Sequence, residues 1–516
     1  MPHPSETAKT YPHKPALIMG DSGTLVTYRD LDERSNQAAQ LFRALGLAKG
    51  DHIAMMLENR HEFLEICWAA QRAGLIFTPV SSHLQAEETA YILDNCGARL
   101  FISSRKLAEV AAAAAHDAAS VEHRFMLSGI RDGFESWEEA VDRQPTSPIA
   151  DEANGVPMLY SSGTTGQPKG VFVAPASDDV HAPHMLAPTL GAAFGFGEET
   201  VYLSPAPLYH AAPLHYTMMA HYLGGTCVVM EKFDPERALA LIEEHRVTHS
   251  QWVPIMFVRM LKLPDEARSR YDLSSMQFAI HAAAPCPIET KEKMIEWWGP
   301  VIVEYYAASE AAGATMVDSQ QWLSHKGTVG RAIMGQVHIV DEDGRELPPR
   351  EIGTVYFSGP QVTFEYHNEP GKTAESYNER GWGTTGDVGY LDEEGFLYLT
   401  DRKHFTIISG GVNIYPQEVE NLLINHDKVA DVAVFGVPDE EFGESVQAVV
   451  QPQNWVDATD EVAFELLDWL RERLSHLKVP KGIDFREQLP RLDNGKLYKR
   501  HLVEEYRAAA RDERAP

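Results

Sequence analysis

Residues 160–170 read YSSGTTGQPKG, a glycine- and hydroxyl-rich stretch that ends in a lysine and a glycine. Its glycines free the backbone for tight turns, so that successive N–H groups can point into one concavity suited to an anion. The stretch therefore predicts a phosphate cradle, with a polar surface loop as the alternative. It differs from the nucleotide P-loop because Lys169 is followed by Gly170 and not by serine or threonine. The candidate binding residues are Ser161, Ser162, Gly163, Thr164, Thr165, Gly166 and Lys169.

The length and composition indicate an ordinary globular protein with several folding units. A chain of 516 residues is too long for one hydrophobic core and predicts roughly three or four units. The formal net charge of −30 disfavours a nucleic-acid partner, which would need clustered lysine and arginine. The four cysteines are far apart and predict reduced packing residues. The first 15 residues lack a signal pattern, and no apolar run approaches the ~20 residues that span a bilayer. We therefore expect a cytoplasmic protein without a transmembrane segment.

The order of predicted elements favours an α/β fold. β-rich runs such as 15–19, 52–57 and 76–80 alternate with helical patterns at 28–45 and 62–73, and the alternation resumes between 201 and 305. This predicts two layered α/β subdomains. Residues 327–400 change to short strands with glycine-containing turns, which predicts a small β-barrel or another β-rich subdomain. We expect an N-terminal domain over 1–401 and a small α+β domain over 402–516.

Four further motifs follow the glycine-rich stretch in order. PLYH (207–210) presents a histidine, and EYYAASE (304–310) follows a predicted strand at the end where α/β sheets bind ligands. The latter motif offers an aromatic face, a hydroxyl and a carboxylate. WGTTGD (382–387) with YLTDR (398–402) supplies an acid and a planar cation. PRLDNGK (490–496) supplies a lysine that could lower the repulsion between two approaching anions. Each motif alone also fits a turn, a core aromatic or a surface residue.

Together and in this order, the five motifs resemble the adenylate-forming superfamily, and most closely its acyl- and aryl-CoA ligases. The resemblance covers essentially the whole chain. It implies that ATP, Mg²⁺ and coenzyme A take part, with the glycine-rich loop over the β- and γ-phosphates. It further implies a catalytic role for Lys496, Glu310 and His210, and Mg²⁺ binding by Glu310 and Thr165. The implied nucleotide- and CoA-binding residues are Ala283, Ala284, Pro285, Glu304, Tyr305, Tyr306, Ala307, Ser309, Asp387, Arg402, Gly410 and Gly411, besides those of the loop.

The resemblance also implies a mobile C-terminal domain. Lys496 must leave the acyl carbon before CoA reaches it, which the family achieves by rotation about a hinge just after Arg402. His404 stands at the hinge position, where aspartate or lysine is more usual. Two other departures are Ala307 in place of glycine and Ser309 in place of threonine; the second keeps the hydroxyl, and the first adds a methyl group near the pocket floor.

The identity of the carboxylic acid stays open at this point. The implied acyl pocket mixes aromatic, small and histidine side chains, which suits a fatty, an aryl or a bulky alicyclic acid: His210, Trp252, Pro254, His281, Ala282, Tyr305, Ala307 and Ala308. No acid lies in 209–214 to hold an α-ammonium group, which disfavours an amino-acid substrate. The alternatives are an enzyme that loads a carrier protein, a luciferase-like oxygenase, and a nucleotide-binding relative without catalysis. A homodimer is a further implication of the resemblance.

Overall fold

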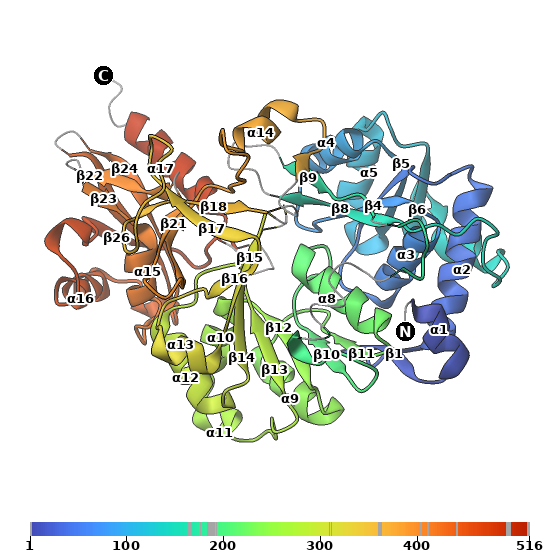
Figure 1. The fold of residues 1–516 in the computed structure, drawn as a ribbon, viewed down its shortest axis with the longest axis horizontal. Coiled ribbons are helices and arrows are strands. Elements are labelled where there is room, and N and C mark those ends of the chain that lie inside the picture. The colour runs from blue at the N-terminus through green and yellow to red at the C-terminus, as the bar shows by residue number, and fades with distance from the viewer. Residues whose placement is uncertain are drawn as a thin grey trace. The chain divides into compact units, whose positions relative to one another are not determined.

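The computed structural model describes residues 3–161, 168–175, 177–182, 191, 193–308, 310, 312–359, 364–402, 405–409, 412–439, 442–491 and 497–512. The chain, coloured from blue to red in Figure 1, forms two compact units. Unit 1 comprises Met1–Gln251, Ser269–Ala279 and Phe364–Glu375, and unit 2 comprises Trp252–Arg268, Ile280–Thr363 and Ser376–Pro516. No helix among these described ranges is long and apolar enough to cross a membrane.

Unit 1 contains a mainly parallel eight-stranded sheet. The strands, in spatial order, are β19 (Glu365–Tyr366), β9 (Lys169–Phe172), β8 (Val156–Ser161), β4 (Ile76–Val80), β3 (His52–Met56), β5 (Ala98–Ser104), β6 (His123–Leu127) and β7 (Glu135–Ser136). Helices α4 (Ala86–Cys96) and α5 (Ala108–Asp117) pack their apolar residues on this sheet (Figure 1). Helix α3 (His61–Arg72) connects β3 to β4, as parallel neighbours require a crossover. The predicted α/β layer is confirmed.

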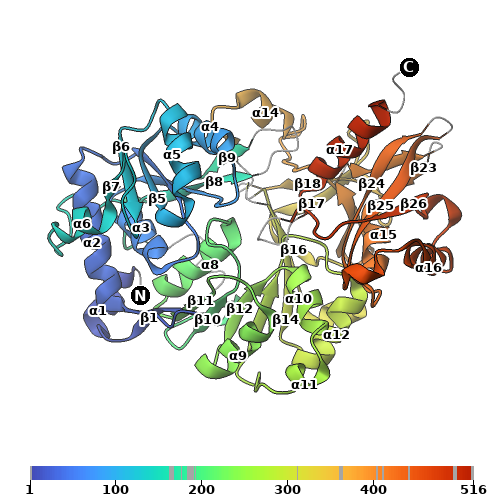
Figure 2. The same ribbon diagram turned by 180° about the vertical axis from the view of Figure 1, so that it is seen from behind.

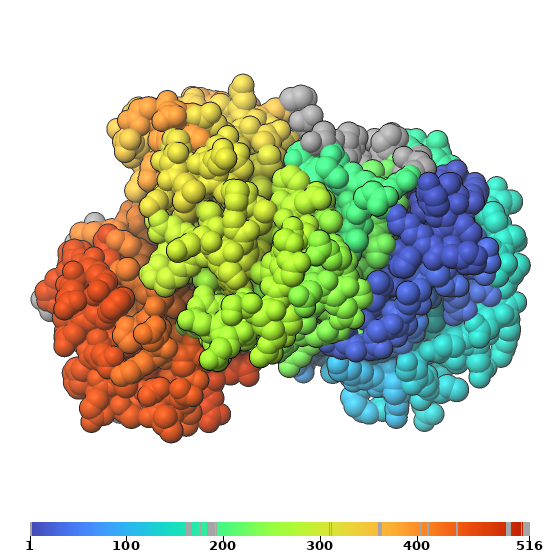
Figure 3. Space-filling view, turned by 90° about the horizontal axis from the view of Figure 1, so that it is seen from below, coloured from blue at the N-terminus to red at the C-terminus, as the bar shows by residue number. Residues whose placement is uncertain are grey.

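A second run of strands in unit 1 has the order β12 (His249–Trp252), β10 (Val201–Ser204), β11 (Thr226–Val229), β1 (Pro15–Met19) and β2 (Leu25–Thr27). The last residue of β12, Trp252, belongs to unit 2. Here β1 and β2 form the predicted antiparallel hairpin, and the other pairs that adjoin β11 are parallel. The helices are α1 (Pro4–Thr10), α2 (Tyr28–Ala44), α6 (Trp137–Asp142), α8 (Ala211–Tyr222), α9 (Pro235–His245) and α14 (Pro370–Glu375). Figure 2 shows the same elements from behind, and in Figure 3 the blue N-terminal residues lie at the surface.

Helix α2 begins where the sequence offers a capping box. Thr27 accepts a hydrogen bond from the backbone of Asp30, whose side chain binds the Thr27 backbone in return. A buried histidine connects two elements of the same unit: His221 accepts from the indole N–H of Trp68 at 3.2 Å and donates through Nε2 to the carbonyl of Ala16 at 2.9 Å. Burial lowers the pKa of His221 to about 4, so the ring is neutral near pH 7.

Unit 2 contains the antiparallel strands β14 (Ile302–Ala307), β15 (Ala314–Asp318) and β16 (Arg331–Met334). Its helices here are α10 (Pro254–Leu261), α11 (Asp265–Arg268), α12 (Ile288–Trp298) and α13 (Ser319–Ser324); the residues of β13 (Phe278–His281) are divided between the units. Helices α10 and α12 place Phe257 and Trp298 around the fully buried Trp252.

The β-rich region of unit 2 is an open four-stranded sheet. Its order is β17 (Gln336–Val340), β18 (Gly353–Ser358), β20 (Asp387–Leu391) and β21 (Leu397–Arg402), with a small core that includes Phe357 and Leu397. The prediction of a small β-barrel was wrong: across the described residues the end strands β17 and β21 do not pair. Four strands are too few to curl into a cylinder with room for its own side chains.

The last part of unit 2 is an α+β layer, as the sequence predicts. Strands β23 (Val412–Ile414), β22 (Ile407–Ser409), β25 (Gly443–Pro452) and β24 (Val429–Asp439) follow one another, and β26 (Gly482–Phe485) joins β25 in parallel. Helices α15 (Pro416–Leu423), α16 (Asp460–Arg471) and α17 (Lys499–Asp512) accompany the sheet. Leu502 of α17 is buried in a cluster with Phe435 and Val449.

Candidate active site

A carboxylate held by two hydroxyl groups lies where β14 ends and β20 begins. Tyr306 donates its hydroxyl to Oδ2 of Asp387 at 2.6 Å, and Thr385 donates to the same oxygen at 2.9 Å. Asp387 is buried, and the Tyr306 ring packs against Phe357 with ring centroids 6.1 Å apart. Hydrogen bonds to an ionised acceptor are stronger than neutral ones. The arrangement therefore fixes the Asp387 carboxylate beside an aromatic face. It also connects two sequence motifs, because Tyr306 and Asp387 are 81 residues apart in the chain.

Glu304, two residues before Tyr306, lies in a buried ion pair. Nζ of Lys291 is 2.6 Å from Oε2 of Glu304, and Nε2 of His281 is 3.7 Å from the same oxygen. Burial raises the pKa of Glu304, and Lys291 opposes the shift. Burial, reinforced by the positive charge of Lys291, lowers the pKa of His281 and keeps its ring neutral. Lys291 was missed by the sequence analysis, because its spacing on α12 marks it as an ordinary helix residue.

The small-residue loop 282–285 leaves β13 with a turn in the left-handed region. Ala283 has φ of 74°, which an alanine rarely adopts, and its side chain is exposed. The preceding Ala282 is buried and donates its N–H to the carbonyl of Trp252 at 3.3 Å. Pro285 is exposed and Ala284 is half-buried. The turn thus carries small side chains that are exposed or half-buried, and its role in binding adenine stays a prediction.

In unit 1 the ends of the glycine-rich stretch belong to a hairpin. Strands β8 and β9 are antiparallel, with Ser161 opposite Lys169. Nζ of Lys169 lies 4.6 Å from the ring centroid of Tyr366 in β19. Tyr160 packs on Gly170 and donates its hydroxyl to Oδ1 of Asn95 at 2.6 Å. A rigid hairpin therefore fixes both ends of the stretch 162–167, whose residues lie outside the described ranges.

His210 lies in unit 1 at the N-cap of α8. The backbone N–H of His210 donates to the carbonyl of Pro207 at 3.2 Å, and the backbone carbonyl of His210 accepts from the N–H of Leu214 at 3.1 Å. The ring lies against that of Tyr209, with centroids 4.3 Å apart, and the residue is half-buried. The backbone of His210 is thus held by a turn on its N-terminal side and by the first turn of α8 on its C-terminal side.

The segment that carries Lys496 is anchored on both sides. Arg491 forms an ion pair with the buried Asp431, with Nη2 2.6 Å from Oδ1. Arg491 also forms an antiparallel bridge with Leu497. Lys496 itself lies outside the described residues, so the contribution of its side chain stays a prediction. Arg491 is a further residue that the sequence analysis did not select.

The remaining predicted residues divide into two groups. Glu310 and Pro254 are buried, Tyr305 and Ala308 are half-buried, and Ala307 is exposed. Ten residues lie outside the described ranges, and of two others only the backbone is described. The ten are Ser162, Gly163, Thr164, Thr165, Gly166, Ser309, His404, Gly410, Gly411 and Lys496, and the two are Ser161 and Arg402. Ser409 and Val412 pair across the glycine pair 410–411, which therefore connects β22 and β23.

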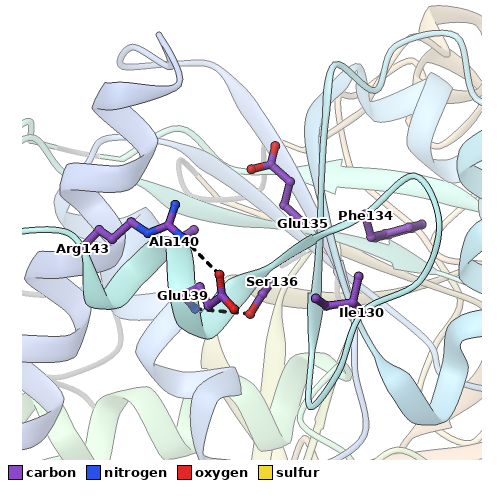
Figure 4. Close-up of a pocket in the computed structure, with 7 residues that line it drawn as sticks. All are labelled: Ile130, Phe134, Glu135, Ser136, Glu139, Ala140 and Arg143. Atoms are coloured by element: carbon purple, nitrogen blue, oxygen red, sulfur yellow. Dashed lines mark hydrogen bonds and ion pairs between the residues drawn. The ribbon is translucent and has the colours of Figure 1, made fainter.

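The surface hollow drawn in Figure 4 contains none of the predicted site residues. Its lining includes Ser136, Glu139 and Arg143 at the start and end of α6 (Figure 4). Ser136 accepts from the backbone N–H of Glu139, and Arg143 donates to the Glu139 carboxylate at 3.0 Å. These three polar residues thus bond to one another within α6 and its N-cap, and the hollow adds nothing to the site.

Comparisons with known proteins identify the class. Residues 5–367 match the AMP-binding enzyme family, and residues 418–496 match the AMP-binding enzyme C-terminal domain. The chain belongs to the AMP-binding enzyme family, in its branch of acid–CoA ligases. The resemblance inferred from the motifs is confirmed.

Curated relatives and solved structures are similar over nearly their whole length. Feruloyl-CoA synthase of Amycolatopsis sp is 34% identical over 96% of both chains. The long-chain-fatty-acid–CoA ligase FadD13 of Mycobacterium tuberculosis is 30% identical over 98% of this chain and 97% of the relative. ATP-bound MatB from Rhodopseudomonas palustris has a TM-score of 0.79 at 28% identity, with 98% of this chain and 99% of that chain covered.

Proposed function

We propose that this acid–CoA ligase works in two steps and that the residues named below carry them. The substrate carboxylate attacks the α-phosphorus of ATP, which forms an acyl-adenylate and releases pyrophosphate. The CoA thiol then attacks the acyl carbon, and AMP leaves. The observation that carries the proposal is the fixed Asp387 carboxylate beside the Tyr306 ring, because adenosine offers a flat base next to two ribose hydroxyls.

Both reaction steps depend on positioning and charge neutralisation, so the enzyme needs no nucleophile of its own. We assign Lys169 and the loop 162–167 to the β- and γ-phosphates, and the loop 283–285 to the adenine. Lys496 would neutralise the approach of the carboxylate to the α-phosphate. The anchoring of Arg491 to Asp431 supports this role, because it holds the residue at which the segment that carries the lysine begins.

Glu310 is the proposed protein ligand of Mg²⁺. Magnesium is commonly held by one or two carboxylates together with substrate phosphates, and it retains water ligands. Within the described ranges no group of three or more His, Cys, Asp or Glu side chains could hold a metal ion. Glu310 is a buried carboxylate at the end of the EYYAASE motif, and Thr165 is the second proposed ligand. When bound, the ion neutralises phosphate charge.

The acid is proposed to be aryl, fatty or bulky alicyclic. The relatives named above act on ferulic acid and on long-chain fatty acids, as their names state. Among the proposed lining residues, the aromatic Tyr305 is half-buried, whereas the aromatic Trp252 and the small Ala282 are buried. His281 has no hydrogen-bond partner for either ring nitrogen among the described residues, and it is fully buried. We propose that His281 lines the acyl pocket.

A pyrophosphate-release screen over a panel of carboxylic acids, with and without CoA, tests the function. Release that depends on an acid and does not need CoA supports adenylate formation. Silence across the panel would instead favour a nucleotide-binding protein without catalysis. Thioester formation with a carrier protein but not with CoA would favour the carrier-loading alternative.

Two variants separate the half-reactions. Lys496→Ala is expected to block adenylate formation and to spare thioester formation from supplied acyl-adenylate. Equal loss of both half-reactions would remove Lys496 from its proposed role. A bulky residue at Gly411 is expected to obstruct only the CoA step, and normal thioester formation from acyl-adenylate would refute this.

The net charge of −30 supports a proposed cytoplasmic location, because the chain resembles freely soluble proteins in composition. The homodimer implied by the family resemblance is a separate proposal. Fractionation of cells tests the cytoplasmic location, and sedimentation of the purified full chain tests the homodimer.

A further inference from the structure

We propose that Asn59 is the positioning residue for the loop that carries His210, and that it thereby sets which acids the enzyme accepts. The inference rests on the proposed function, in which His210 borders the acyl pocket. Asn59 was not selected by the sequence analysis. It follows β3, whereas His210 follows β10, so the two residues lie after strands of different sheets.

Three hydrogen bonds connect the Asn59 side chain to backbone groups. Its Nδ2 donates to the carbonyl of Ala206 at 3.1 Å and to the carbonyl of Met230 at 2.8 Å. Its Oδ1 accepts from the N–H of Leu208 at 2.8 Å. Two carbonyl acceptors and one N–H donor fit only an amide, and they also fix which end of the amide is nitrogen.

The bonds hold both ends of a three-residue span, Ala206 to Leu208, that lies just before the histidine. Ala206 and Leu208 are almost completely buried, and the intervening Pro207 accepts the N–H of His210 in a turn. Asn59 therefore fixes the backbone up to two residues before His210, and α8 begins immediately after it. The third bond, to Met230, ties this span to the end of β11, next to β10.

Burial makes these contacts consequential. Asn59 is 8% exposed, and a buried backbone group that loses its partner incurs its full desolvation cost. Loss of the amide leaves Leu208 and the two carbonyl groups without this partner, and the loop must move to find another. A displaced loop carries the His210 ring with it, so the effect should fall on the acid and not on ATP.

The test uses Asn59→Asp, which keeps the shape and the acceptor but directs a carboxylate at two carbonyl oxygens. Asn59→Ala is the second variant, because it introduces no charge and remains informative if the first does not fold. The readout is the ratio of kcat/KM for the best acid of the panel to that for a bulkier acid. The fraction of folded enzyme cancels in this ratio. Asn36→Ala, which removes another buried asparagine of unit 1 that does not contact the loop, is the matched control.

We expect the ratio to change by about tenfold or more in both Asn59 variants, with the KM for ATP within about twofold of wild type. In a His210→Ala background the same Asn59 substitutions should no longer change the ratio, because residues that act through one group are not additive. An unchanged ratio, or a change that persists in the His210→Ala background, would overturn the inference and leave Asn59 a purely structural residue.

Two further outcomes separate this inference from the function on which it rests. If His210→Ala leaves the ratio unchanged while wild type is active, His210 does not border the acid and the inference fails alone. If the wild-type enzyme releases no pyrophosphate with any acid, the proposed function fails first.

Discussion

Replacement of Tyr306 by phenylalanine tests how the enzyme positions the ribose of ATP. The substitution keeps the aromatic ring beside Phe357 and removes only the hydroxyl that donates to Asp387 at 2.6 Å. A hydrogen bond to a charged group contributes about 1.5–3 kcal/mol, which corresponds to a change of about 10- to 150-fold. Thr385 still donates to Asp387 in the variant, so we expect the lower part of this range.

The assay is acid-dependent pyrophosphate release at varied ATP concentration. We expect kcat/KM for ATP to fall by about tenfold or more, whereas the KM for the acid should change little. Tyr398→Phe is the matched control, because Tyr398 is a half-buried tyrosine that donates to another aspartate, Asp392, at 3.3 Å. An unchanged kcat/KM for ATP in Tyr306→Phe, or an equal fall in the control, would refute the assignment of Asp387 to the ribose.

Three further predictions concern stability. Burial lowers the pKa of His221 to about 4, so the stability that depends on its neutral ring is fully present above pH 6.5, and up to about 3 kcal/mol of it is lost as the pH falls towards 4. His221→Asn should flatten this pH dependence of the free energy of unfolding, measured with urea. An unchanged pH dependence in the variant would contradict the prediction. Lys291→Met leaves the buried Glu304 without its ion-pair partner and should lower the free energy of unfolding by about 3–5 kcal/mol. In thermal unfolding, the further substitution Glu304→Leu should restore much of this stability. A double variant no more stable than Lys291→Met alone would refute the ion-pair explanation. In Gly155→Ala the new methyl group would lie 2.3 and 2.6 Å from two backbone carbonyl oxygens, so the free energy of unfolding should drop by about 1–3 kcal/mol. Gly371→Ala, with open space around it, is the control whose free energy of unfolding should not drop, and an equal stability of the two variants would contradict the prediction.

Much of the fold could be predicted because the periodicity and turn residues agree with the observed elements. The run at 52–57 and the helical pattern that follows it correspond to β3 and α3, which form a parallel crossover to β4. The sequence also placed Tyr306 at the end of a strand, where the structure has it in β14. These features depend on local patterns that a sequence displays directly.

The missing parts depend on contacts between residues that are far apart in the sequence. Lys291 has no local pattern that marks it, and only the approach of α12 to β14 makes it the partner of Glu304. In the sequence, Asn59 is likewise only a polar residue after a strand. Its partner Ala206 is 147 residues further along the chain, and only the fold brings the two within hydrogen-bond distance. The barrel was predicted wrongly because strand length and turns do not specify whether the end strands pair.

The nucleotide product tests the central claim most directly, since adenylate chemistry cleaves ATP between its α- and β-phosphates. With an acid of the panel, ATP and CoA, the enzyme is predicted to form one AMP and one pyrophosphate for each acyl-CoA, and the acyl-adenylate should accumulate when CoA is omitted. Formation of ADP and inorganic phosphate in place of AMP and pyrophosphate would contradict it.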